Sequence, residues 1–217
     1  MKQLIFLVVL LVSCTHNDYL KRNYESNKSL LNHNLTSHMP LTTSNFTILI
    51  QSNISSILKD SVSKGFNPLE LFIVEKYDEH TFDVKLNNVN LNKQNCHYAN
   101  DTNLILIGQY LLHKYGYFKF VGFEEGDESK EIISRNFRNK NNFPVPVFDI
   151  TGYKKSSYVG LSEEFQICVI EAKQGIYASS DVLSKDNLMP DNWKHGFSKG
   201  YAISEKEKTI IYWCMVW

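Results

Sequence analysis

Apolar residues first recur at helical spacing between residues 46 and 62. The positions in this repeat are Phe46, Leu49, Ile50, Ile54, Ile57, Leu58 and Val62. Steps of one, three and four residues place them on one face of an α-helix. Thr43 or Ser44 can cap the start of this helix, and Gly65 can end it. The pattern therefore predicts an amphipathic helix.

Three stretches in the middle of the chain have the patterns of β-strands. Residues 71–74 form a continuous apolar run after the Asn67-Pro68 break. Residues 81–86 alternate apolar and polar side chains, as a half-exposed strand does, and residues 117–123 alternate in the same way. We expect a strand at each of the three.

The segments around these strands are less uniform. Residues 87–103 are rich in Asn and predict a loop. Residues 104–115 are long and apolar enough for a buried helix, although their opening Leu-Ile-Leu-Ile equally fits a strand. Residues 126–139 predict a polar helix. Residues 145–150 predict a short strand, at a sheet edge because the neighbouring prolines cannot donate to a ladder.

The C-terminal third predicts β-structure, with strands over residues 165–172, 201–204 and 209–217. The last two pair across a charged tip at residues 205–208. Because the final strand is apolar on both faces, it needs cover on both sides, and we expect it to be central in the sheet. Together the patterns predict an α+β fold: an antiparallel or mixed sheet with two or three packed helices and a C-terminal β-hairpin.

The first thirteen residues have the composition of a signal peptide. Lys2 gives a positive start, and Leu4–Val12 is an unbroken apolar segment. A membrane-spanning helix needs roughly 20 apolar residues, which the polar sequence from Thr15 onward does not provide. We therefore interpret residues 1–13 as an export signal that is removed.

The end of this segment, Leu11-Val12-Ser13-Cys14, resembles the lipobox of bacterial lipoproteins. The resemblance implies cleavage before Cys14 and a thioether-linked diacylglycerol on Cys14, usually with a third acyl chain such as palmitate. It also implies a lipid-anchored protein of the bacterial cell envelope. Thr15 is not the Asp that retains enterobacterial lipoproteins in the inner membrane, so the resemblance favours the outer membrane. An ordinary secretory signal is the alternative.

Residues 15–43 are rich in Asn, Ser, Thr, His and Lys and have no hydrophobic repeat. Such a segment buries too little apolar surface to offset the entropy of ordering it. We therefore expect three parts: a signal peptide over residues 1–13, a flexible tether over residues 14–43, and a single α+β domain over residues 44–217.

The overall charge narrows the choice of partners. Lys and Arg together number 23, as do Asp and Glu, so the formal net charge is zero. Proteins that bind nucleic acid through its phosphates carry an excess of basic residues. We expect no nucleic-acid partner.

Three cysteines lie in the expected domain, Cys96, Cys168 and Cys214. In an oxidising compartment they allow at most one disulfide and leave one thiol over. Cys168 and Cys214 lie at even-numbered positions of apolar strands, so we expect both in the core, and the sequence does not tell whether they are bridged. Because burial suppresses thiol reactivity, Cys96 is expected to be the most reactive of the three.

Residues 196–200, Gly-Phe-Ser-Lys-Gly, match the G-x-S-x-G pattern of serine hydrolases. That mechanism needs an acid and then a histidine after the serine, and no Asp or His follows Ser198. We therefore interpret Gly196 and Gly200 as turn glycines ahead of the hairpin. We expect no catalytic role for Ser198.

Metal and cofactor motifs are also missing from the sequence. No pair of histidines or cysteines has the spacing of a metal site, and a site assembled from His97, Asp101 and His195 has no support from spacing. A P-loop and a dinucleotide fingerprint are absent. We expect no cofactor, no metal and no catalytic residue.

A polar and aromatic loop precedes the C-terminal strands. Asn192, Trp193 and His195 combine ring stacking with hydrogen-bonding ends, as residues of sugar or peptide sites do. The alternative is that they pack as a core beneath the loop. Because loops often carry function, these three residues are the candidate ligand face.

Together these patterns favour a non-catalytic envelope lipoprotein that binds a protein or a glycan and is held at the membrane by its lipid anchor. One alternative is an envelope enzyme, such as a cell-wall or glycan hydrolase acting through carboxylates. Another is a periplasmic immunity protein. An enzyme is the less favoured class because no catalytic constellation has the required spacing or order.

Overall fold

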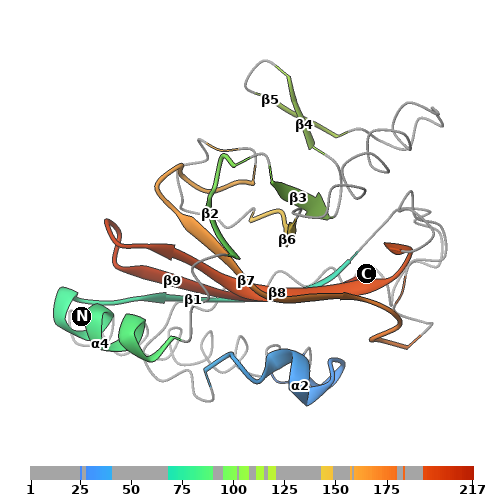
Figure 1. Cartoon of the computed structure of the whole chain (residues 1–217), viewed down its shortest axis with the longest axis horizontal. Coiled ribbons are helices and arrows are strands. Elements are labelled where there is room, and N and C mark those ends of the chain that lie inside the picture. The colour runs from blue at the N-terminus through green and yellow to red at the C-terminus, as the bar shows by residue number, and fades with distance from the viewer. Residues whose placement is uncertain are drawn as a thin grey trace, which may run out of the picture.

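The structure is a computed structural model, and it describes residues 25, 28–40, 68–89, 95–101, 103–107, 111–114, 117–120, 143–148, 157, 159–179, 183 and 193–217. Figure 1 shows its elements: α2 (His33–Thr36), β1 (Leu69–Lys76), α4 (Glu79–Asn88), β2 (Cys96–Tyr98), β3 (Leu104–Ile107), β4 (Leu111–Lys114), β5 (Tyr117–Phe120), β6 (Phe143–Pro146), β7 (Gln166–Gln174), β8 (Gly196–Ser204) and β9 (Thr209–Val216). No helix among the described residues is long and apolar enough to cross a bilayer.

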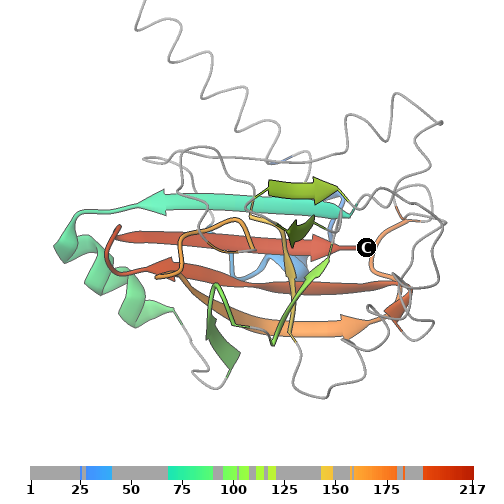
Figure 2. The same ribbon diagram turned by 90° about the horizontal axis from the view of Figure 1, so that it is seen from above.

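The centre of the fold is a five-stranded antiparallel sheet in the order β1-β9-β8-β7-β2, seen from above in Figure 2. β9 lies between β1 and β8, and every residue of β8 and β9 is buried. The prediction of a central last strand is thus confirmed. The β8–β9 hairpin also follows the prediction, since Ser204 pairs with Thr209 across the charged turn.

The predicted α+β class is wrong, because the described fold is mostly antiparallel sheet with two short helices. The predicted helix over residues 104–115 is replaced by two strands. Its opening Leu-Ile-Leu-Ile is β3, which pairs in parallel with β6, and β4 pairs with β5. The predicted helices over residues 46–62 and 126–139 lie outside the described residues.

The predicted strand over residues 81–86 is also wrong, since this segment belongs to the helix α4. Asp78 caps the helix by accepting a hydrogen bond from the backbone N–H of Thr81 at 2.9 Å. Phe82 and Leu86 are four residues apart and face the core together, whereas Val84 points outward and is 49% exposed. Apolar alternation therefore coincides with helical spacing here, and the cap favours the helix.

The sheet has a hydrophobic core on each face. Figure 1 shows α2 on one side of the sheet and β3 and β6 on the other. The first face, here called the helix-covered face, packs against α4 and residues 28–40. Its largest strand residues include Ile73, Tyr201 and Tyr212. The second, the strand-covered face, carries Trp213 and Phe72 and packs against β3, β6 and the neighbouring loops. Burial on both faces explains why the central strands are apolar throughout.

Residues 28–40, which the sequence assigned to a flexible tether, lie against the helix-covered face. Leu31, Leu35 and Met39 are at most 5% exposed and belong to its core. They are spaced four residues apart, so they lie on the same side of this segment. This part of the expected tether therefore belongs to the folded domain.

Gly196 and Gly200 lie inside β8 and are not turn glycines, which corrects that interpretation. They stand opposite Trp217 and Trp213 across the β8–β9 ladder. A Cβ atom would lie 2.7 Å from Cζ2 of Trp217 at residue 196, and 2.8 Å from Cζ2 of Trp213 at residue 200. The glycines leave room for the indole rings to lie on the sheet.

Candidate functional site

Two residues of the candidate ligand face, Trp193 and His195, contact Trp217. Asn192 and Cys14 lie outside the described residues. The ring of Trp193 stacks on that of Trp217, with centroids 5.9 Å apart, and Nε1 of Trp217 donates to the carbonyl of Trp193. Nδ1 of His195 lies 3.3 Å from the carbonyl oxygen of Trp217. The contacts of Trp193 and His195 thus hold Trp217 in place beside β8.

Ser198, the serine of the hydrolase-like pattern, is buried in β8. Its hydroxyl donates a 2.6 Å hydrogen bond to the carbonyl of Pro144 and so ties the sheet to β6. In the folded protein this hydroxyl faces the core and not solvent.

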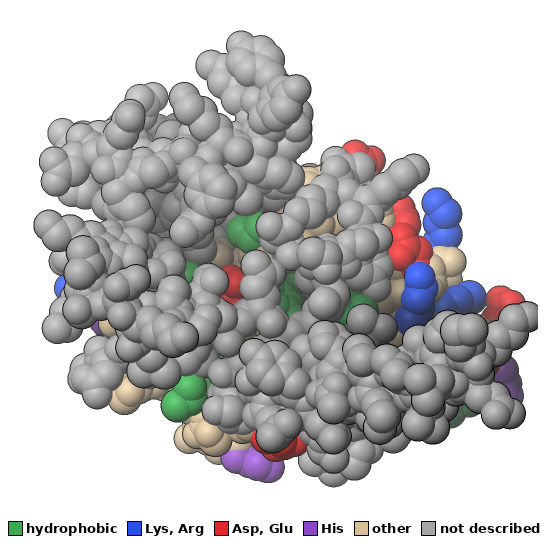
Figure 3. Space-filling view, turned by 180° about the vertical axis from the view of Figure 1, so that it is seen from behind, with side chains coloured by type: hydrophobic (Ala, Val, Ile, Leu, Met, Phe, Trp, Pro, Cys, Tyr) green, Lys and Arg blue, Asp and Glu red, His purple; other side chains and the backbone are tan. Residues whose placement is uncertain are grey.

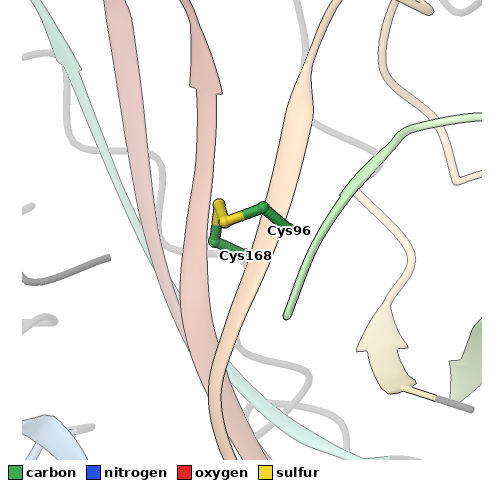
Figure 4. The surroundings of a disulfide bond; sticks show 2 residues. All are labelled: Cys96 and Cys168. Carbon is green, nitrogen blue, oxygen red and sulfur yellow. A yellow bond between two sulfur atoms is a disulfide. The ribbon is translucent and has the colours of Figure 1, made fainter. Parts of the chain in front are cut away.

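The cysteines differ from the prediction in one respect. Cys96 forms a disulfide with Cys168 between β2 and β7, so it is not the reactive thiol expected from the sequence (Figure 4). Cys168 and Cys214 are buried as predicted. Cys214 carries a free thiol, and its burial raises the pKa to about 12.

The register of the strands places side chains of distant segments in rows across the helix-covered face. The first row is Tyr98, Gln166, Ile203, Ile210 and Glu75. The second row is Cys96, Cys168, Tyr201, Tyr212 and Ile73. α4 and the residues 28–40 cover part of these rows. At the end of the first row, at β2 and β7, no described residue covers the row.

A groove of about 790 Å³ lies at this open end. Its lining residues are Leu86, Asn87, Asn88, Val89, Cys96, His97, Tyr98, Gln166, Ile203 and Glu205. They come from the end of α4, the edge strand β2, the start of β7 and the β8–β9 turn. The volume falls in the range of about 300–1,000 Å³ that is usual for small-ligand sites.

One wall of the groove is the last turn of α4. The helix is fixed to the sheet by Phe82, which is buried, and by Lys208, whose Nζ lies 3.2 Å from the carboxylate of Glu79 and 5.3 Å from the Phe82 ring centroid. The helix closes at Val89, whose backbone N–H bonds to the carbonyls of Lys85 and Leu86. The wall therefore has a fixed position relative to the strands.

The opposite wall is β2, a strand of only three residues. The disulfide pins its first residue, and the N–H of Ala99 donates to the carbonyl of Phe165 just beyond its end. Nδ1 of His97 donates to Asp101 at 2.9 Å, and the His97 ring packs on Phe143. Bonds from the backbone N–H of Asn103 and from His97 lower the pKa of Asp101.

The structure brings His97 and Asp101 together but not His195, so the three do not form the site considered from the sequence. His195 precedes Gly196 at one end of β8, whereas the groove lies near Ile203 at the other end. Among the described residues, no group of three or more His, Cys, Asp or Glu side chains is arranged to hold a metal ion.

The groove is polar and carries little charge. Of the lining residues that the structure describes, Glu205 alone carries a carboxylate, and none is Lys or Arg. Tyr98 is 56% exposed, whereas Ile203, another lining residue, is 4% exposed. Figure 3 shows that basic and acidic side chains mix at the end of the molecule with α4 and the β8–β9 turn, so that end has no charge of a single sign.

A second polar cluster lies farther along the same face, beneath residues 28–40. We call it the clasp and define it by Asn34, His38, Glu171 and Lys199. Nζ of Lys199 donates to the carbonyl of Asn34 at 2.9 Å and lies 3.2 Å from the carboxylate of Glu171. Nε2 of His38 donates to the carbonyl of Trp213 at 3.0 Å. These bonds attach residues 28–40 to the sheet.

A β-bulge in β7 builds the clasp. Pairing with β8 shifts between Val169 and Glu171, which leaves Ile170 outside the register. Without the shift, the next residue after Val169 would stand opposite Lys199. The bulge instead puts the carboxylate of Glu171 there, and Lys173 and Lys199 lower its pKa by hydrogen bonding and charge.

Burial shifts the pKa of three further groups, one in the clasp and two in β1. Desolvation lowers the pKa of His38 to about 4 and raises that of Glu70 to about 8. It also raises the pKa of Glu75. Each shift favours the uncharged form, as expected for a group removed from water.

No protein-family model, curated protein or solved structure matches the chain. The residues of the groove were not identified by sequence reasoning. Tyr98 follows Cys96 and His97 in a stretch that reads as a loop, and Gln166 and Glu205 lie in other elements. These residues meet only through the sheet register, which no local motif encodes.

Proposed function

We propose that this protein is a lipid-anchored, non-catalytic binding module of the bacterial cell envelope, and that the groove beside Tyr98 is its ligand site. The anchor part of the proposal rests on the resemblance of residues 11–14 to a lipobox. The binding part rests on the groove, where Tyr98 is exposed on the β2 wall, and this wall is fixed by a disulfide and a backbone hydrogen bond.

The composition of the groove supports binding in preference to chemistry. Amide side chains from Asn87, Asn88 and Gln166 can both donate and accept hydrogen bonds, but they are poor acids, bases and nucleophiles. The His97–Asp101 pair has the geometry of a base and its orienting carboxylate, yet no serine, threonine or free cysteine lines the described groove.

The two buried carboxyl groups of β1 are unsuited to act together as a glycosidase pair. Glu70 and Glu75 are five residues apart, so their side chains point to opposite faces of the sheet. At about 3.3 Å per residue they are also about 16 Å apart along the strand. A pair that flanks a glycosidic bond needs a separation of about 5–10 Å on the same side.

The anchor is tested by replacing Cys14 with Ser in the native host. We expect unprocessed precursor and no incorporation of radiolabelled palmitate, whereas the wild-type protein is labelled and stays with the membrane fraction. Wild-type protein released unlipidated into the medium would show that the segment is an ordinary secretory signal.

The groove is tested by hydrogen exchange on the mature lipoprotein in detergent micelles. Periplasmic proteins and solubilised envelope glycans are added as two separate fractions. We expect one fraction to protect the backbone amides of residues 86–89 and 96–98. Gln166→Trp, which fills the groove, should abolish the protection, and Val84→Trp on the outer side of α4 should retain it. Protection by neither fraction, or protection that persists in Gln166→Trp, would contradict the proposal.

A further inference from the structure

We propose that the ligand of the groove is an uncharged oligosaccharide, with Tyr98 as the ring on which one pyranose stacks. This inference rests on the proposed function of the groove and adds the class of ligand. Its starting point is that the described part of the groove joins an exposed aromatic ring to amide side chains and includes no basic residue.

Tyr98 has the properties of a stacking platform. It is 56% exposed at the end of β2, and its cross-strand neighbour on β7 is Gln166. The Cys96–Cys168 disulfide lies two residues before it, and the Ala99–Phe165 hydrogen bond lies directly after it. The backbone of Tyr98 is thus held from both sides. When a ligand stacks on the ring, only the side-chain torsions of Tyr98 have to become ordered. Stacking on a ring whose backbone is held costs less conformational entropy than stacking on a ring carried by a mobile loop.

The polar side chains near this ring match the hydroxyls of a sugar. Every hydroxyl is both a donor and an acceptor, and a primary amide offers both functions in one plane. Gln166 lies directly beside Tyr98, and Asn87 and Asn88 end the facing wall. The carboxylate of Glu205 adds acceptors that can take two hydroxyl donors. The groove therefore presents groups suited to several neighbouring hydroxyls.

Apolar surface completes the match. Ile203 forms part of the floor, with Leu86 and Val89 on the wall of α4. A pyranose ring has an apolar face of C–H groups and an edge of hydroxyls, so it can contact a tyrosine ring and aliphatic side chains while its edge bonds to amides. Small apolar areas next to exposed amides suit this amphipathic ring.

Charge decides against anionic ligands. Among the described residues that line the groove, neither Lys nor Arg is present to pair with a phosphate or a carboxylate, and Glu205 repels both. The strand edge decides against a peptide in extended conformation. β2 offers three residues, and the carbonyl of Tyr98 already accepts a hydrogen bond from the N–H of Asp101. Strand addition needs a longer row of main-chain partners.

The test measures binding of cellotetraose and chitotetraose, two uncharged oligosaccharides, by isothermal titration calorimetry on the mature lipoprotein. Tetragalacturonate is the anionic counterpart, and an uncharged tetrapeptide is the alternative ligand. We expect one or both uncharged saccharides to bind, and tetragalacturonate to bind at least about tenfold more weakly because of Glu205. Glu205→Gln should reduce this difference.

Three variants locate the bound sugar. Tyr98→Ala should weaken binding by roughly tenfold, and Tyr98→Phe should change it by less than about threefold because the ring remains. Val84→Ala, on the outer side of α4, is the matched control and should bind as the wild type does. Equal binding by Tyr98→Ala and wild type would overturn the inference. Tyr98→Phe retains the ring, so it separates loss of stacking from damage to β2.

The outcomes separate this inference from the function on which it rests. If a periplasmic protein or the tetrapeptide binds at the groove and neither saccharide does, the ligand class is wrong while the binding module stands. If no fraction and no probe reaches the groove, the proposed function fails as well. Tighter binding of tetragalacturonate than of the uncharged sugars would also overturn the inference.

Discussion

The clasp and the groove lie on the same face of the sheet, but their polar groups have different surroundings. In the clasp, Lys199 is 8% exposed and bonds to Glu171 and to the carbonyl of Asn34. In the groove, Tyr98 and Gln166 are exposed to solvent beside a buried floor. The clasp is closed by the protein itself, whereas the groove is open.

This difference separates two roles for polar residues on one sheet. Polar groups that the fold encloses must be bonded within the protein, because an unpaired buried group costs free energy. Polar groups at an open groove can exchange water for a ligand. Variants of the clasp should therefore lower stability, and variants of the groove should change binding while stability stays nearly the same.

The largest effect is expected where residues 28–40 enter the core. Leu35→Ala removes a side chain that is 4% exposed and leaves a cavity, so it should lower the free energy of unfolding by about 2–4 kcal/mol. Leu30→Ala is the matched control, because Leu30 is 41% exposed in the same segment, and its effect should stay below about 1 kcal/mol. Urea unfolding monitored by tryptophan fluorescence gives both values. Equal effects would show that residues 28–40 do not pack on the sheet in solution.

Acid should weaken the clasp through His38. Its pKa is about 4 in the folded protein and 6.5 ordinarily, so the unfolded chain takes up the proton first. The stability from a neutral His38 is complete above pH 6.5 and is lost as the pH falls toward 4. A second cation would then lie beside Lys199, and the loss should reach at most about 3 kcal/mol.

The pH effect of His38 has to be separated from that of Glu70, which has the opposite sign. Glu70 has a raised pKa of about 8. The stability that comes from its neutral form is therefore complete below pH 4.5 and is lost as the pH rises toward 8. Urea unfolding at several pH values is therefore measured in Glu70→Gln. The loss of stability at low pH should persist in this variant and should become smaller when His38→Asn is added. If His38→Asn leaves the dependence of the unfolding free energy on pH unchanged, another group causes the loss of stability in acid.

A smaller effect is expected from the ion pairs of the clasp. Lys199→Met keeps the aliphatic stem and leaves the carbonyl of Asn34 without its donor, which should cost about 1–2 kcal/mol. Lys173→Met breaks the other ion pair of Glu171, but the Lys173 side chain is 63% exposed, so its cost should be below about 0.5 kcal/mol. Chemical denaturation of the two variants compares them directly. A greater cost for Lys173→Met would contradict the assignment of Lys199 as the central residue of the clasp.

The parts of the fold that were predictable are those set by local pattern. β9 is apolar on both faces from Ile210 to Val216, and a central place in the sheet, covered on both sides, satisfies that. In residues 81–86 the local pattern fits two structures, and the cap at Asp78 selects the helix. Leu31, Leu35 and Met39 recur every four residues, a signal that the polar composition of the segment obscured.

The parts that were not predictable depend on register between distant strands. Nothing in the sequence of β7 marks the bulge at Ile170, yet this one residue decides that Glu171 faces Lys199. The Cys96–Cys168 bond likewise requires that β2 and β7 pair, and three cysteines allow three pairings. Tyr98 becomes part of a groove only because that pairing sets it beside Gln166.

The smallest change in stability is expected at the groove. Tyr98→Ala removes an exposed ring from an edge strand that the disulfide and the Ala99–Phe165 hydrogen bond hold in place. Its free energy of unfolding should therefore stay within about 0.5 kcal/mol of the wild-type value. Hydrogen exchange at residues 96–98, measured without ligand, checks that β2 keeps its pairing. A loss comparable to that of Leu35→Ala would mean that Tyr98 is a structural residue. The contrast between an enclosed clasp and an open groove would then not hold.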